Sequence, residues 1–273
     1  MTNAAAHPLV DQRDARGGVR SADVDTHEFR RYGSKVDDVA TAGPAIHVEI
    51  WSDVVCPWCY IGKRRFERAL DELGGEVEVE YVFRAFQLDP TASPGKSQPV
   101  AEAYARKFGG PETAQRMIDR VTSIAADEGL EFRLDRAWRA NTLLAHRLLW
   151  LAEQPDSPVA QRELKERLLQ AYFHDGLDIG DPDVLATCAA EVGFDLDTVR
   201  DFLDSDSGMR EVRADIEQAI EYGITGVPAF VINGRWSIPG AQDTDTFVSV
   251  FRQMQDRMVV ESAPVCEDDI CDV

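Results

Sequence analysis

Residues 51–63 read Trp-Ser-Asp-Val-Val-Cys-Pro-Trp-Cys-Tyr-Ile-Gly-Lys, and the expected organisation of the whole chain follows from them. An apolar, β-prone run over residues 46–50 leads into them. Two cysteines, Cys56 and Cys59, are separated by two residues, and a helical pattern begins at once. This stretch therefore predicts a strand, a short turn and a helix, with both cysteines at the start of the helix.

The start of a helix is a place where a thiol ionises easily. Several backbone N–H groups there have no intrahelical partner, and the helix dipole presents its positive end. Because thiolate is the nucleophilic form of cysteine, we predict that Cys56 attacks, partly ionised near neutral pH, and that Cys59 resolves. Pro57 suits the first helical turn, where its missing N–H is not needed. Trp58 supplies no cation, so we expect the pKa of Cys56 to be less depressed than where a histidine stands between the cysteines.

The C-x-x-C spacing alone allows two other interpretations. It can be half of a zinc site, which needs a second pair of ligands. It can also be two packed thiols, because free cysteine is often buried. The strand-to-helix context favours a thioredoxin-like redox site over both.

The composition limits the partners and the compartment. The 273 residues allow one large domain or two modest ones, and 44% hydrophobic residues are enough for a core. A net charge of −20 speaks against nucleic acid or a membrane surface as a partner. Residues 1–10 lack a signal-peptide pattern, and no apolar run approaches the roughly 20 residues that cross a bilayer. Since five cysteines are too few for a disulfide framework, we expect a cytoplasmic protein.

The hydrophobic pattern divides the chain into four parts. We expect residues 1–43 to be a disordered extension and residues 261–273 to be an acidic tail. Residues 44–98 and 223–260 predict one discontinuous α/β domain, and residues 99–222 a helical insertion domain. The insertion helices are expected at Val100–Phe108, Pro111–Asp127, Arg136–Gln154, Pro158–Phe173, Pro182–Val192, Asp197–Leu203 and Met209–Glu221.

The two outer parts predict β-α-β and β-β-α units. The helix after the cysteines ends at Gly74-Gly75, and residues 77–83 alternate as a strand. Near the C-terminus, Gly226-Val227-Pro228 precedes an apolar strand over residues 229–232. Asn233-Gly234 signals a hairpin, and a final helix is expected over residues 244–258. The predicted fold class is therefore α/β, with a large all-helical insertion.

These motifs together resemble the DsbA-type thioredoxin superfamily, and within it the FrnE-like dithiol–disulfide oxidoreductases. The resemblance covers residues 46–258 and is carried by Asp53–Gly62, Asn141, Ala145-His146-Arg147, Ala171-Tyr172-Phe173 and Gly226–Val231. It implies a thioredoxin-like core with a DsbA-like helical insertion. It also implies that Val227-Pro228 is a cis bond packed against the cysteines, with the Val227 backbone facing an extended substrate.

The resemblance implies a thiol–disulfide oxidoreductase or isomerase that needs no cofactor and acts on protein or small-molecule thiols and disulfides. One alternative in the same superfamily is a 2-hydroxychromene-2-carboxylate isomerase or a glutathione-transferase-like enzyme, which usually carries serine near the position of Cys56. The second is a chaperone-like binding module in which redox chemistry is incidental. The presence of both Cys56 and Cys59 favours disulfide exchange.

A second cysteine pair, Cys266 and Cys271, stands in the acidic tail. We predict an accessory redox pair that exchanges with Cys56 and Cys59, because the spacing closes a small loop. An inert tail, or a four-thiolate metal site with C-x-x-C, remains open. Cys188 lies on an apolar helix face and is assigned to the core.

The remaining polar signals are weaker. His174 is the histidine expected to line a groove of the insertion, whereas His146 is expected to be structural. The basic run 63–65 is expected to form a solvated face. The aspartate clusters do not match the calcium-loop spacing, so no metal site is predicted from them.

Overall fold

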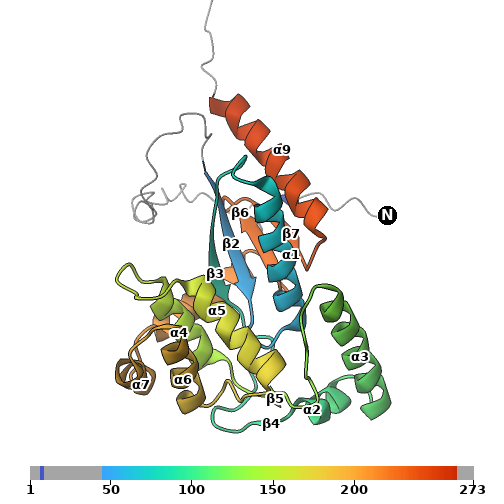
Figure 1. Cartoon of the computed structure of the whole chain (residues 1–273), viewed down its shortest axis with the longest axis vertical. Coiled ribbons are helices and arrows are strands. Elements are labelled where there is room, and N and C mark those ends of the chain that lie inside the picture. The colour runs from blue at the N-terminus through green and yellow to red at the C-terminus, as the bar shows by residue number, and fades with distance from the viewer. Residues whose placement is uncertain (1–6, 9–44, 263–273) are drawn as a thin grey trace, which may run out of the picture.

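A mixed five-stranded β-sheet forms the centre of one half of the molecule, and helices make up most of the other half (Figure 1). The structure, a computed structural model, describes residues 7–8 and 45–262. The strand order is β1-β7-β6-β2-β3. Their bounds are β1 His7–Pro8, β2 Ile46–Ser52, β3 Val79–Ala85, β6 Ala229–Ile232 and β7 Trp236–Pro239.

Strand β2 is the central strand and ends at the cysteine motif. It pairs in parallel with β3, from Ile46 opposite Val79 to Ser52 opposite Ala85, and antiparallel with β6. The parallel pair requires a crossover, which helix α1 (Pro57–Leu73) supplies. The predicted α/β class, with β-α-β and β-β-α units around a helical insertion, is confirmed.

One face of the sheet is covered by α1 and α9 (Thr244–Ser262), which lie side by side in Figure 1. Phe66 of α1 is fully buried at the centre of this layer. Its ring lies between 5.1 and 5.9 Å from four other aromatic rings, those of Tyr81, Phe230, Phe247 and Phe251. Aromatic packing of this kind fixes the height of α1 on the sheet, and with it the position of the cysteines.

Helix α8 (Met209–Glu221) covers the opposite face. Trp51 of β2 is fully buried there and donates a hydrogen bond from Nε1 to the carbonyl oxygen of Asp215, at 3.0 Å. Successive side chains of a strand point to opposite faces of the sheet, so the two faces of β2 pack against different helices.

The other helices have a core of their own, built mostly from leucine, alanine and aromatic residues. Their bounds are α2 Val100–Lys107, α3 Pro111–Asp127, α4 Leu143–Glu153, α5 Gln161–Gln170, α6 Pro182–Val192 and α7 Leu196–Asp204. A π-helical turn, η1 Ala171–Asp175, continues α5. The predictions for α3, α6 and α8 match the observed bounds at both ends.

Two helix predictions are wrong at their starts. Residues 136–142 are not helical: β5 (Trp138–Arg139) pairs with β4 (Gln98–Pro99), and the Asn141 side chain donates to the carbonyl of Ala92 and accepts from the N–H of Leu143. The Asn141 side chain thereby links the loop at Ala92 to the first residue of α4. The helix expected from Pro158 begins at Gln161, because the Ser157 hydroxyl bonds within its own turn, to Val159.

One short part of the predicted extension belongs to the sheet. His7 and Pro8 form β1, which pairs with β7 at the edge, and two residues are too few to show a strand period in the sequence. Within residues 45–262, no helix is long and apolar enough to cross a membrane.

Candidate active site

Cys56 is the N-cap residue of α1, and Cys59 lies in its first turn. Pro57 occupies the first turn as predicted, and the Cys59 N–H donates to the Cys56 carbonyl at 3.0 Å. Both cysteines are free thiols and almost fully buried, at 3% and 2% exposed. The chain geometry therefore places both sulfur atoms at the same end of α1.

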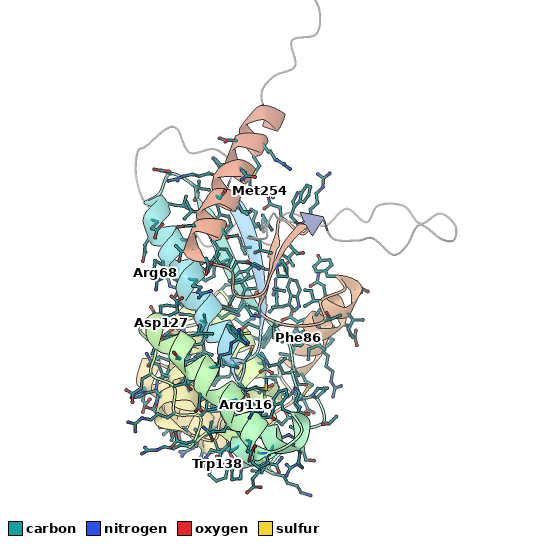
Figure 2. All side chains as sticks on the ribbon, turned by 90° about the vertical axis from the view of Figure 1, so that its right-hand side faces the viewer. Arg68, Phe86, Arg116, Asp127, Trp138 and Met254 are labelled. Carbon is teal, nitrogen blue, oxygen red and sulfur yellow. The ribbon has the colours of Figure 1, made fainter. Side chains whose placement is uncertain are left out.

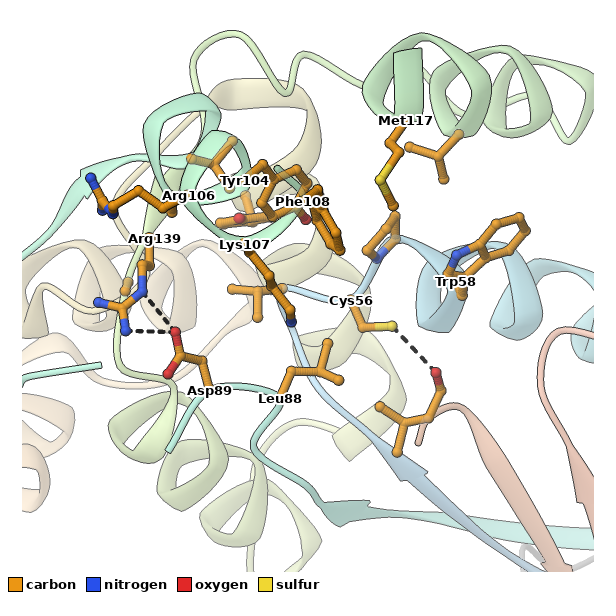
Figure 3. A pocket seen from close by; sticks show the side chains of 18 of the residues that line it. Cys56, Trp58, Leu88, Asp89, Tyr104, Arg106, Lys107, Phe108, Met117 and Arg139 are labelled. Atoms are coloured by element: carbon orange, nitrogen blue, oxygen red, sulfur yellow. Dashed lines mark hydrogen bonds and ion pairs between the residues drawn. The ribbon is translucent and has the colours of Figure 1, made fainter. Parts of the chain in front are cut away.

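The loop before β6 lies directly over Cys56. The Val227–Pro228 peptide bond is cis, as the resemblance implied. The Cys56 thiol donates to the carbonyl oxygen of Val227, at 3.5 Å (Figure 3). Gly62 of α1 permits this approach, because a Cβ at that position would lie 2.9 Å from Cγ of Pro228.

A cavity of about 960 Å³ opens beside Cys56. Cys56, Trp58 and Val227 line it from the thioredoxin-like part of the chain, whereas Tyr104, Met117 and other residues line it from the helical part. Cys59 is not among the lining residues. An incoming substrate in this cavity would therefore meet Cys56 first, which suits the attacking role predicted for it.

Behind the motif, at the end of β2, lies a buried carboxylate that the sequence analysis did not single out. Asp53 is fully buried, and its Oδ2 accepts from the N–H of Leu88 at 2.8 Å. Nε2 of His146 lies 3.3 Å from Oδ1 of Asp53 and 3.0 Å from the carbonyl oxygen of Phe86. Because both neighbours of Nε2 are acceptors, that nitrogen carries the proton. His146 is thus structural, as expected, but the side chain that it positions, Asp53, lies next to the cysteine pair.

Lys165 of α5 is the least expected residue of the site. Its side chain is 1% exposed, and Nζ has no hydrogen-bond partner in the part of the chain that the structure describes. Nζ lies 5.2 Å from the centre of the Phe83 ring. Burial lowers the pKa of Lys165 to about 8, although the negative charges of Cys59, Asp53 and Cys56 act in the opposite direction. A cation without a hydrogen-bond partner is therefore buried close to the cysteine pair.

The two thiols share their protons unequally. Burial raises the pKa of Cys56 well above its usual value, and the hydrogen bond and charge of Cys59 add to this effect. Burial also disfavours the Cys59 thiolate, but the hydrogen bond from Cys56 and the positive charge of Lys165 outweigh it and lower the pKa of Cys59. The first proton therefore leaves Cys59. The expectation that the helix start lowers the pKa of Cys56 is wrong, because burial and the neighbouring Cys59 raise it.

Two predictions for other basic residues are also wrong. His174 lies outside the cavity lining: its side chain is 51% exposed, and Nδ1 lies 3.5 Å from a carboxylate oxygen of Glu131. The run 63–65 is not a solvated face. Lys63 is buried and paired with Glu67 and Glu166, at 2.8 and 2.6 Å.

Arg65 of the same run pairs with Glu128 at the end of α3, and so does Arg68 one turn further along α1. Figure 2 shows Asp127 at that end of α3 near the α1 segment that carries Arg68. These ion pairs join α1 to the wall of the cavity. The alternation of leucines and charges in α1 could not reveal them, because the acidic partners are distant in sequence.

A signal for Lys165 was present in the sequence. Leu164, Leu168 and Leu169 define the buried stripe of α5, and position 165 falls within that stripe. A lysine inside an apolar stripe is rarely buried without a reason. Cys188 is buried in the helical core, as predicted.

The accessory pair Cys266 and Cys271 lies outside the described residues, so its role remains a prediction. Among residues 7–8 and 45–262, no group of three or more histidine, cysteine or acidic side chains is arranged to hold a metal ion.

Comparisons with known proteins agree with this architecture. A family model described as a DSBA-like thioredoxin domain matches residues 47–252. The uncharacterized protein YwbO of Bacillus subtilis (strain 168) is 31% identical over 204 residues, which are 74% of this chain and 94% of YwbO.

Two solved structures show the range of chemistry found on the fold. A probable DsbA oxidoreductase from Streptomyces coelicolor is 35% identical, with a TM-score of 0.71, over 82% of this chain and 94% of that one. A 2-hydroxychromene-2-carboxylate isomerase is 14% identical, with a TM-score of 0.55, over 80% of this chain and all of that one. At that identity the second likeness concerns the fold alone.

Proposed function

The chain belongs to the DSBA-like thioredoxin domain family, and from that membership and the site geometry we propose that it is a thiol–disulfide oxidoreductase that works through Cys56 and Cys59. The observation that carries the proposal is the arrangement of the pair. One thiol lines a cavity, and the other is behind it next to a buried cation. The packed thiol of Cys188, by contrast, does not line the cavity.

The reaction begins with a proton transfer within the pair. Of the two thiols Cys59 is the easier to ionise, so the Cys56 thiolate forms when Cys56 gives its proton to the Cys59 thiolate as a disulfide enters the cavity. The Cys56 thiolate then attacks one sulfur of the substrate and releases the other as a thiolate. This step forms a mixed disulfide between Cys56 and the substrate, within the lining of the cavity.

The second step closes the disulfide of the enzyme. Cys59 loses its proton, and its thiolate attacks the Cys56 sulfur and releases the remaining half of the substrate. The positive charge of Lys165 favours the Cys59 thiolate and therefore this step. The two steps together transfer two electrons from the dithiol to the substrate. In the reverse direction, the same chemistry oxidises a client.

The isomerase or transferase alternative needs a different first residue. In the resemblance described above that position usually carries serine, and here it is Cys56. Such an enzyme turns over with glutathione and leaves its own cysteines unchanged. This difference separates the two functions experimentally.

The test is a trap for the mixed disulfide. With Cys266 and Cys271 replaced by serine, the Cys59→Ser variant should accumulate one covalently bound half-substrate on Cys56 when it is mixed with a small disulfide, as read by intact mass. The Cys56→Ser variant should accumulate none, and the Cys188→Ser variant should form the normal disulfide. If Cys59→Ser gains no adduct while the folded protein is intact by circular dichroism, the oxidoreductase proposal is wrong.

A further inference from the structure

The charge of the cavity beside Cys56 is opposite to that of the whole protein. The chain has 29 lysines and arginines against 49 acidic residues. Of the 21 residues that line the cavity, four are basic, namely Arg106, Lys107, Arg120 and Arg139, and one is acidic, Asp89. A site that collects cations in an acidic protein points to an anionic ligand.

Three of the four cations have no carboxylate partner among the described residues. Arg139 is paired with Asp89 at 2.6 Å. Arg106 donates to the side-chain oxygen of Gln98, which is neutral, and within residues 45–262 neither Lys107 nor Arg120 has an ion-pair partner. In Figure 3 the Lys107 side chain extends from α2 into the cavity, whereas the Arg106 guanidinium points away from Cys56. Lys107 is therefore the cation best placed to meet a ligand.

The rest of the lining is mostly apolar and aromatic. Trp58, Leu88, Tyr104, Phe108 and Met117 surround the approach to Cys56 (Figure 3). The volume of about 960 Å³ lies in the range of sites for small molecules, roughly 300–1,000 Å³. An aromatic wall with unpaired cations suits a molecule that has an apolar body and a carboxylate.

We propose that this cavity selects a small disulfide, or the corresponding thiol, in which a carboxylate is attached to an aromatic or apolar body. The carboxylate lies toward Lys107 and Arg120, the body lies against the aromatic wall, and the sulfur faces Cys56. The inference rests on the proposed oxidoreductase function and specifies its substrate class.

Two aromatic disulfides, one anionic and one neutral, serve as probes. 5,5′-Dithiobis(2-nitrobenzoate) has a carboxylate on each ring, and 4,4′-dithiodipyridine has none. Each takes two electrons from the enzyme dithiol and yields two thiols that are followed by their absorbance, while Cys56 and Cys59 become a disulfide. The rate constants are measured by stopped flow with reduced protein in which Cys266 and Cys271 are serine.

The charge variants are Lys107→Gln and Arg120→Gln, singly and together. Arg116→Gln is the matched control, because Arg116 lies on the same helix as Arg120 but does not line the cavity. An exposed ion pair is worth up to about fivefold per charge, so we expect the double variant to react several-fold to about 20-fold more slowly with the anionic disulfide. The rate with the neutral disulfide and both rates of Arg116→Gln should stay within about twofold, and added salt should reduce the difference between wild type and the double variant for the anionic disulfide.

Each other result has a definite meaning. If Arg116→Gln slows the anionic probe as much as Lys107→Gln does, the effect comes from the overall charge and the site is not selective. If the double variant reacts equally more slowly with both probes, the cations do not bind the carboxylate. Either result overturns the inference while leaving the oxidoreductase proposal intact. If wild-type protein reduces neither probe and forms no Cys56–Cys59 disulfide, the proposed function itself fails.

Discussion

Replacement of Lys165 by methionine should make the protein more stable at neutral pH. The side chain is 1% exposed and its Nζ has no hydrogen-bond partner within residues 45–262, so no hydrogen bond replaces the hydration that the ammonium group loses. Methionine has a similar length and no charge, and the apolar neighbours Leu164 and Leu168 can accept it. The variant therefore removes the charge and keeps the packing.

The magnitude follows from the pKa of Lys165, which falls from its ordinary value of 10.5 to about 8. Each pKa unit corresponds to about 1.4 kcal/mol, so burial of the charged form costs about 3 kcal/mol. The sign follows from proton binding. Between pH 8 and about 10.5 the unfolded chain holds a proton on Lys165 that the folded protein has lost, so the free energy of unfolding rises with pH there.

Below pH 8 both states are protonated and the full cost is present. The Lys165→Met variant should accordingly be more stable than wild type by about 3 kcal/mol at pH 7, and the difference should shrink toward zero as the pH approaches 10.5. Urea denaturation at a series of pH values measures it, with a phosphine reductant present so that both proteins keep their cysteines reduced. Subtraction of the two curves removes the titration of the groups that do not interact with Lys165, and Cys59, whose pKa Lys165 lowers, is replaced by serine in both proteins.

Lys63→Met is the matched control, because Lys63 is equally buried but paired. Its removal leaves the carboxylates of Glu67 and Glu166 without their cation, and breaking such a pair typically costs ~3–5 kcal/mol. The two lysine variants should therefore shift the stability in opposite directions. A Lys165→Met protein that is less stable at pH 7, or a difference that does not change between pH 8 and 10.5, would refute the reasoning.

Three other substitutions test the architecture around the site. Gly62→Ala places a Cβ 2.9 Å from Pro228, so it should lower the free energy of unfolding by about 1–3 kcal/mol and slow disulfide exchange, as urea denaturation and the stopped-flow assay would show. Phe66→Ala removes the central ring of the α1 layer and should cost about 3–5 kcal/mol in the same denaturation assay; a loss below 1 kcal/mol would contradict that role. His174→Ala should leave the exchange rate of Cys56 within about twofold, since His174 lies outside the cavity, and a tenfold loss would restore it to the site.

The sequence was sufficient to predict an element or a site residue wherever the signal lies within a few neighbouring residues. The cysteine motif is a strand end, a proline and a helix start in one continuous run, so Cys56 and the bounds of β2 and α1 could be placed closely. Helix α6 is framed by Asp181, whose carboxylate accepts from two backbone N–H groups, and by Gly193 in a left-handed conformation. One signal lies directly before the helix and the other directly after it.

The sequence was insufficient to predict contacts between side chains that are far apart in the chain. Lys63 is followed by Arg64 and Arg65 and resembles a solvated run, yet its partner Glu166 lies about a hundred residues further on. His174 and His146 are both single histidines on helices. Only the fold decides which of them contacts Asp53, and the sequence analysis favoured the wrong one for the site.

The two sulfur atoms face different parts of the protein, and this separation gives each part a distinct effect on the reaction. Cys56 meets the cavity, so the cations there can change which disulfide is attacked first but act little on the closing step. Cys59 is behind Cys56 and responds to Lys165, which acts on every substrate alike. A Lys107 variant should therefore change the ratio of rates between an anionic and a neutral disulfide, whereas a Lys165 variant should slow both in the same proportion. A buried charge that destabilises the fold by about 3 kcal/mol is then explained by its effect on Cys59, whose pKa it lowers.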